Sequence, residues 1–265
     1  MFRSRCVVVG GVAILGLVGY ATPVRADVCD LSSRNTCLTN GAYYSNILAS
    51  GTFTIDPFLQ MKTTGSTTTT EQGYNTAGDA DPSTGKKDYQ FDQSGSTRAL
   101  QLSEIPLSPT IGSMEYREFL LNITEPDSGP DISLDQLQIF LSSSNNLTSY
   151  DTTSRTLNGL TAVYDLDAGG TNNWIKLNYN LVKSTGPGAM IVYIPNYLFT
   201  QSGGQYVYVY SQFGSQLAAN NGMEEWWIRS SAGSRTITRV PEPGTLLLFG
   251  TATVLTGLRL RRRFR

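Results

Sequence analysis

Trp174-Ile-Lys-Leu-Asn-Tyr-Asn-Leu181 is the stretch that decides the fold class of this chain, because its side chains alternate between apolar and polar. One side of the repeat contains Ile175, Leu177, Tyr179 and Leu181, and the other contains Lys176, Asn178 and Asn180. A strand with one face in a core and the other in solvent shows this period of two. The stretch therefore predicts a β-strand that buries one face.

The same period recurs along the chain, and turn signals separate the segments that show it. Clusters such as Gly186-Pro-Gly188 and Asn220-Asn-Gly222 lie between them, and no strong helical periodicity occurs from Asp27 to Val240. Short strands joined by such turns predict an all-β fold, an antiparallel β-sandwich that is jelly-roll-like. The candidate strands are 51–55, 98–102, 119–123, 137–141, 175–181, 190–194, 206–210 and 223–229.

The C-terminal end follows a different pattern, made of three parts in a fixed order. It has an extended start, an uncharged apolar run over 245–258 and a basic end. At about 1.5 Å per residue the run gives a helix of about 21 Å, which is short for a bilayer core of about 30 Å. The basic end favours a cytosolic C-terminus. Residues 240–265 therefore predict a short transmembrane helix, with Val240, Pro241, Glu242 and Pro243 before it and Arg261, Arg262, Arg263 and Arg265 after it.

In these three parts and their order, residues 240–265 resemble the PEP-CTERM protein-sorting signal of Gram-negative bacteria. The resemblance implies recognition by an exosortase, a membrane-embedded cysteine transpeptidase that cuts near Pro241-Glu242-Pro243. It also implies a setting of exopolysaccharide and biofilm, with the body released or attached outside the inner membrane. Further motifs lie in the body, namely Tyr116-Arg-Glu-Phe119, Val163-Tyr-Asp-Leu-Asp167, Tyr206-Val-Tyr-Val-Tyr210-Ser-Gln-Phe-Gly214 and Glu224-Glu-Trp226. Through them the segment 115–229 resembles, more loosely, the bodies of such proteins, which supports β structure and names no activity.

The N-terminal end reads as a secretory signal. Arg3 and Arg5 precede an apolar stretch over 6–20, and Val24-Arg25-Ala26 places a small residue where signal peptidase cuts. A retained N-terminal anchor is the alternative. The predicted organisation is a signal peptide over 1–26, an extracellular β domain over 27–239 and a sorting signal over 240–265.

The net charge of −1 for the whole chain hides an acidic body. Of the 20 Lys and Arg, three lie in the predicted signal peptide and five in the tail, which leaves 12 in the body. Of the 21 Asp and Glu, only Glu242 lies outside the body, so its charge is the difference between 12 and 20, or −8. An acidic body argues against nucleic-acid binding, which needs a basic face.

The cysteine and histidine content limits the disulfides, catalytic sites and metal sites that the chain can form. Cys6 lies in the predicted signal peptide, and Cys29 and Cys37 then make an even pair in an oxidising compartment, so a disulfide between them is expected. The chain has no histidine, which excludes Ser-His-Asp and Cys-His catalysis and histidine-ligated metal sites. The adjacent Glu224 and Glu225 point to opposite faces of a strand and make a poor catalytic pair.

Two binding hypotheses remain. Asp165 and Asp167 precede Gly169-Gly170, and alternating Asp with Gly suits a calcium ion; ordinary Asx turns are the alternative. An aromatic set suits stacking on sugar rings; burial in the sandwich core is the alternative. That set is Tyr206, Tyr208, Tyr210 and Trp226.

The sequence thus predicts a secreted or cell-surface protein that is not an enzyme and has no obligatory cofactor. We expect a structural or adhesive role associated with exopolysaccharide. A secreted carbohydrate-active enzyme and a calcium-stabilised adhesion module are the alternatives. The expected partners are signal peptidase, the inner membrane before processing, exosortase and exopolysaccharide.

Overall fold

The computed structural model describes residues 27–47, 54–62, 69–78, 89–181, 189–201, 203–220 and 222–229. These residues form strands and three short 3-10 helices, η1 (Leu102–Glu104), η2 (Tyr179–Leu181) and η3 (Asn196–Phe199), so the prediction of an all-β body is confirmed. No helix in this part of the chain is long and apolar enough to cross a membrane. The predicted signal peptide and transmembrane helix lie outside the described residues.

The first sheet has seven strands in the order β1-β13-β9-β15-β5, with β12 paired to β9 and β6 paired to β15. β1 and β13 are parallel, and all other pairs of this sheet are antiparallel. The sequence did not predict the parallel pair. The bounds are β1 Val28–Asp30, β5 Glu71–Tyr74, β6 Leu100–Gln101, β9 Asp131–Ser142, β12 Tyr164–Asp165, β13 Trp174–Asn178 and β15 Tyr206–Phe213.

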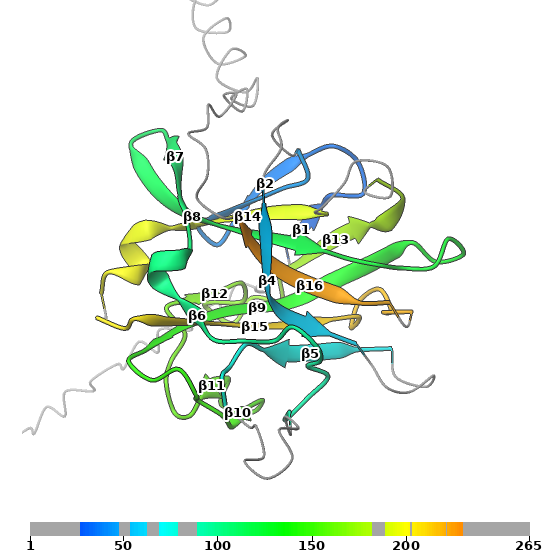
Figure 1. The fold of residues 1–265 in the computed structure, drawn as a ribbon. Helices are drawn as coiled ribbons and strands as arrows, with labels where there is room; N and C mark the ends of the chain where they lie inside the picture. Colours follow the sequence, from blue (N-terminus) through cyan, green and yellow to red (C-terminus); the bar gives the residue numbers. More distant parts are fainter. Residues whose placement is uncertain are drawn as a thin grey trace, which may run out of the picture.

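The second sheet also has seven strands, in the order β2-β3-β14-β8-β16-β4 with β7 paired to β8, and all are antiparallel. In Figure 1 the strands β7, β8 and β14 of this sheet lie above β9, β15 and β5 of the first sheet, and the small β10-β11 sheet lies below both sheets. The bounds are β2 Thr36–Thr39, β3 Ala42–Ser45, β4 Ile55–Met61, β7 Leu107–Ile111, β8 Met114–Asn122, β10 Tyr150–Asp151, β11 Thr156–Leu157, β14 Met190–Pro195 and β16 Glu224–Arg229.

The main core fills the space between the two sheets. The period of two sends alternate side chains of each strand into it, for example Val207 and Val209 from β15 and Phe119 and Leu121 from β8. These side chains are almost fully buried and belong to one continuous cluster that draws on both sheets. The two-layer arrangement predicted from the alternation is present, although fourteen strands exceed the eight of a jelly roll.

The outer faces of the two sheets differ. The outer face of the first sheet carries buried aromatic residues, which Tyr150 of β10, Leu157 of β11 and Phe91 cover as a third layer. The outer face of the second sheet carries a smaller cluster drawn entirely from its own strands. That cluster contains Leu120, Ile191 and Trp227, with the partly buried Ile55 and Tyr193 beside them.

Several predicted boundaries are wrong, each for a local reason. The strand predicted to reach Leu181 ends at Asn178, because the Asn178 side chain accepts a hydrogen bond from the Asn180 N–H and starts η2. The strand predicted over 98–102 shortens to β6, because η1 begins at Leu102. Of the strand predicted over 51–55, residues 51–53 lie outside the described residues, and Ile55 is the first residue of β4.

Candidate functional site

Asp165 and Asp167 lie at the end of β12 and in the turn that follows it, and both face Arg155. Arg155 Nη2 lies 2.6 Å from Asp165 Oδ1, and Arg155 Nη1 lies 3.2 Å from Asp167 Oδ2. The backbone of Arg155 has a φ of 56°, in the left-handed region that costs a non-glycine residue about 1 kcal/mol. The two ion pairs compensate for this conformation in the β10–β11 loop.

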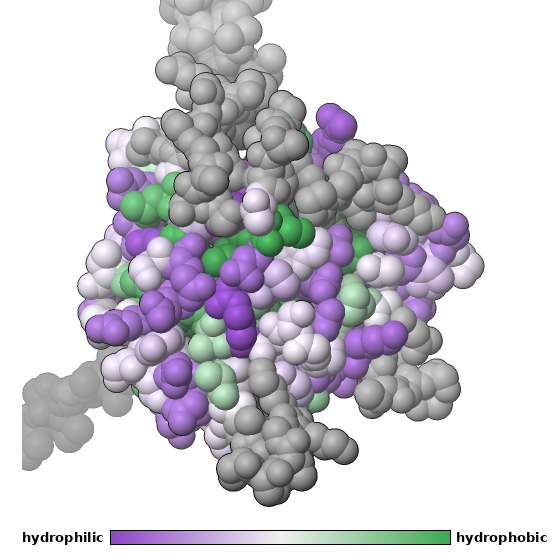
Figure 2. Space-filling view, in the orientation of Figure 1, coloured by the Kyte–Doolittle hydropathy of each residue, from purple (hydrophilic) through white to green (hydrophobic). Residues whose placement is uncertain are grey.

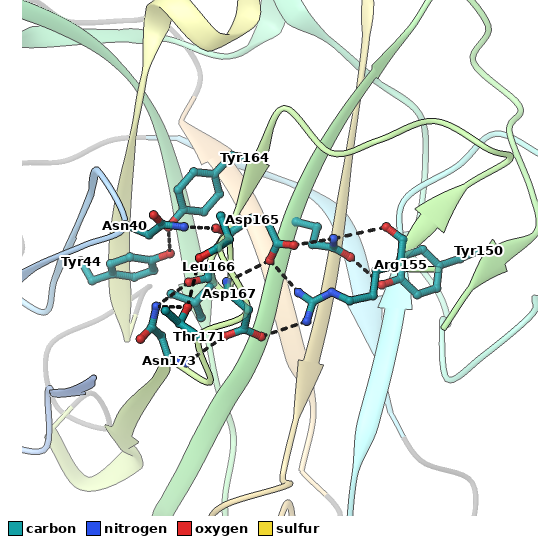
Figure 3. A network of polar contacts seen from close by, with 12 residues as sticks. Asn40, Tyr44, Tyr150, Arg155, Tyr164, Asp165, Leu166, Asp167, Thr171 and Asn173 are labelled. Carbon is teal, nitrogen blue, oxygen red and sulfur yellow. Dashed lines mark hydrogen bonds and ion pairs between the residues drawn. The ribbon is translucent and has the colours of Figure 1, made fainter. Parts of the chain in front are cut away.

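These two residues also accept hydrogen bonds from other groups. Asp165 accepts hydrogen bonds from the Gln138 side chain at 3.0 Å and from the Asp167 N–H at 2.9 Å. Asp167 accepts one from the Asn173 N–H at 2.8 Å, and the backbone carbonyl of Asp165 accepts another from Asn40. Figure 3 shows Arg155 reaching between the two carboxylates on one side and Tyr150 on the other.

This geometry bears on the calcium hypothesis. A guanidinium stands beside both proposed ligands, and no group of three or more Asp, Glu, His or Cys side chains within the described ranges is arranged to hold a metal ion. Burial raises the pKa of Asp167 against the opposing effect of Arg155. Burial acts to lower the pKa of Arg155, but the two carboxylates outweigh it and raise that pKa. The site therefore works as an internal ion-pair network, and calcium binding stays a prediction.

The proposed aromatic platform is in the interior. Tyr208 and Tyr210 are each 1% exposed on the outer face of the first sheet, and Trp226 is fully buried between the sheets. Tyr210 stacks on Tyr150 with ring centroids 3.8 Å apart. No sugar can reach these rings, so the stacking prediction is wrong for Tyr208, Tyr210 and Trp226, while Tyr206 is half-buried at the margin of the cluster.

The polar atoms of these aromatic residues find partners inside the protein, which explains why they can be buried. The Tyr208 hydroxyl donates to the Ser144 carbonyl at 2.7 Å, and the Tyr210 hydroxyl donates to Gln72 at 2.8 Å. The Trp226 indole donates to Ser211 Oγ at 2.9 Å across the sandwich.

A cluster of buried carboxyl groups is the feature that sequence reasoning missed. Glu71 of β5, Glu224 of β16 and Glu125, which follows β8, are all almost fully buried. The prediction that Glu224 and Glu225 point to opposite faces is confirmed, since Glu225 is partly exposed and accepts a hydrogen bond from Gln60 at 2.7 Å. The partners of Glu224 come from distant segments, so only the fold brings them together.

The predicted disulfide between Cys29 and Cys37 is present, with Cα atoms 5.8 Å apart. Cys29 belongs to β1 of the first sheet and Cys37 belongs to β2 of the second. The bond therefore connects the two layers at the start of the described chain.

Comparison with known families addresses the C-terminal end, which lies outside the described residues. The family model for the PEP-CTERM protein-sorting motif matches residues 239–263. The chain carries a PEP-CTERM sorting motif. This motif marks a protein for export, recognition by an exosortase and a surface or extracellular destination, so the predicted sorting route is confirmed in that coarse form. The match includes Val240, Pro241, Glu242 and Pro243 and the arginines up to 263.

The PEP-CTERM match covers only the tail of the chain. No curated protein and no solved structure matches this chain.

Proposed function

We propose that the body is a non-enzymatic structural or adhesive component of an exopolysaccharide-containing extracellular matrix, delivered by the PEP-CTERM motif. The match over residues 239–263 carries this proposal, because it directs the body to the place where such a matrix forms. The acidic, disulfide-bonded β body suits an oxidising exterior.

A non-enzymatic role is favoured by the state of the acidic groups. Glycoside hydrolysis needs two carboxyl groups that reach the substrate. The carboxyls that converge in the body are Glu71, Glu125 and Glu224, and they are sealed in the interior. Asp165 and Asp167 are engaged by Arg155. Neither group of acids is open to a sugar chain.

An adhesive role needs a surface, and the outer face of the second sheet is the best candidate. Tyr43 of β3 and Tyr193 of β14 are register partners on this face, and both are partly exposed. Leu38 of β2 pairs with Tyr43 and is exposed, and Tyr197 at the margin is 52% exposed. Figure 2 shows a largely polar surface on which apolar residues gather over the upper sheet. Tyrosine rings beside apolar side chains are suited to stacking on sugars.

The sorting part of the proposal is tested by expressing the full chain and a variant that lacks residues 240–265, and then fractionating cells, membranes and medium. We expect the full chain to be cleaved and to leave the inner membrane. A full chain that stays there uncleaved would contradict the sorting account.

The adhesive part is tested by pull-down of the exported protein with exopolysaccharide from the producing cells. We expect Tyr43→Ala plus Tyr193→Ala to weaken the association, while Tyr206→Ala on the other sheet leaves it unchanged. Equal binding by both variants would remove this face from the proposal, and no binding by the wild type would remove the adhesive role.

A further inference from the structure

Glu71 and Glu224 face each other across the interior of the sandwich. Glu71 lies opposite Phe213 in the row of β5 and β15 side chains that points inward, and Glu224 lies two residues before Trp226 in the inward row of β16. The bond from Trp226 to Ser211 joins the same two sheets one step along the strands. The Glu71–Glu224 pair is therefore the contact between the two sheets that follows the Trp226–Ser211 contact, and Glu71 itself belongs to the edge strand β5.

The surroundings of this pair are acidic. Glu71, Glu125 and Glu225 are the charged groups that act on Glu224, and Asp92 is the further acid that interacts with Glu71. The strands β4 and β15 present Met61 and Phe213 as the direct register partners of the two glutamates, and neither carries a charge. Both carboxyl oxygens of Glu224 are buried and receive no hydrogen bond from an amide or hydroxyl donor of the described residues. The carboxyl group of Glu71 is the hydrogen-bonding group that Glu224 meets.

We propose that Glu71 and Glu224 share one proton across the sandwich interior, and that loss of this proton opens the edge strand β5 as pH rises. With the proton in place, the O–H of one carboxyl donates to the oxygen of the other. When the proton leaves to solvent, two negative charges remain in a low-dielectric interior, which is strongly unfavourable. Among the described strands β5 pairs with β15 alone, and its other edge is hydrogen-bonded only to the irregular segment around Asp92. It is therefore the element that can move to hydrate them.

The direction of the pH dependence follows from the burial of the pair. Burial is the largest effect on Glu224 and raises its pKa well above the usual range, and the interaction with Glu71 adds to it. The closed state holds a proton that the open state has lost, so closure is stable below the pKa of an exposed glutamate and weakens as pH rises toward the folded pKa. The equilibrium constant for opening of β5 increases about tenfold per pH unit for each proton released.

Hydrogen exchange of the full chain between pH 5 and pH 9, purified in a mild detergent, tests this proposal. After correction for the intrinsic exchange rate, the protection factors of the β5 amides should fall about tenfold per pH unit. Those of the central strand β9 should stay nearly constant. Glu224→Gln should flatten the β5 profile, because the amide supplies a permanent donor to Glu71.

Two further variants and one additive complete the test. Glu225→Gln, on the outer face of the same strand, is the matched control and should keep the wild-type slope. Glu71→Gln should flatten the slope if Glu224→Gln does not fold. An unchanged β5 slope in the folded inner-face variants would overturn the proposal. So would loss of the β5 protection at pH 5 when a calcium chelator is added, because a cation and not a proton would then join the pair in the closed state.

Discussion

Replacing Arg155 with alanine should destabilise the body more than any other single charge removal on its surface. The change leaves the Asp167 side chain, which is 5% exposed, without its cation, and it removes the second ion pair to Asp165. Breaking a buried pair costs about 3–5 kcal/mol. Because the Arg155 side chain is itself 30% exposed, we expect the lower end, about 3 kcal/mol. For a domain of this size that lowers Tm by about 6–12 °C.

The matched control is Arg98→Ala. Arg98 also binds two carboxylates, with Asp56 and Glu104 each 2.9 Å away, but its partners are more exposed, Asp56 by 50%. Exposed pairs of this kind contribute less than about 1 kcal/mol. Thermal unfolding followed by circular dichroism compares the two variants directly. Added salt should reduce the small effect of Arg98→Ala and leave most of the effect of Arg155→Ala.

Two results would refute this reasoning. An Arg155→Ala variant no less stable than Arg98→Ala would show that the network is a surface feature of little weight. A rise in wild-type Tm with calcium, abolished by Asp165→Ala plus Asp167→Ala, would show that the carboxylates serve a metal ion and that Arg155 is not their main partner.

Three further predictions concern other parts of the body. Replacing Cys29 and Cys37 with serine should lower the free energy of unfolding by roughly 2.5 kcal/mol, from the entropy of the eight-residue separation they close, and reductant should affect only the wild type in denaturant titrations. Burial raises the pKa of Glu125 to about 7, so the wild type should lose about 3 kcal/mol between pH 4.5 and pH 7; Glu125→Gln should remove that loss in urea unfolding measured at each pH. Trp226→Phe should cost about 1–3 kcal/mol, measured in the same way, because it leaves the buried Ser211 hydroxyl without its indole donor.

The sequence predicted most of the long strands, because their alternation is a local property, and it missed short ones such as β1, β5 and β7. In β15 the valines and tyrosines separate onto two faces, as the period of two requires. The same alternation does not say what covers each face. The tyrosine face is buried because β10, β11 and Phe91 pack over it, and these come from segments that show little periodicity.

Other parts were missed for two different reasons. The hairpin of β2 and β3 had a visible signal, since Asn40-Gly41 adopts positive φ values of 48° and 83° at the turn, and this pair favours a two-residue hairpin loop. The meeting of Glu71, Glu125 and Glu224 had none, because it depends on the register of strands far apart in the chain. Arg155 was missed as a partner of Asp165 and Asp167 although it lies close to them in sequence, because their approach depends on how the β10–β11 loop folds back and no periodic pattern shows this.

The burial of the aromatic residues changes where adhesion can occur on this molecule. The tyrosines on the outer face of the first sheet are buried under a third layer. On that side of the molecule it is therefore mainly the β10–β11 loop that a partner could contact. The second sheet keeps Tyr43 and Tyr193 partly exposed on a face whose apolar cluster includes only its own strands. An acidic body gains no affinity for anionic polymers from its net charge. The proposed adhesion therefore depends on ring and apolar contacts at the second sheet, and it should be insensitive to salt.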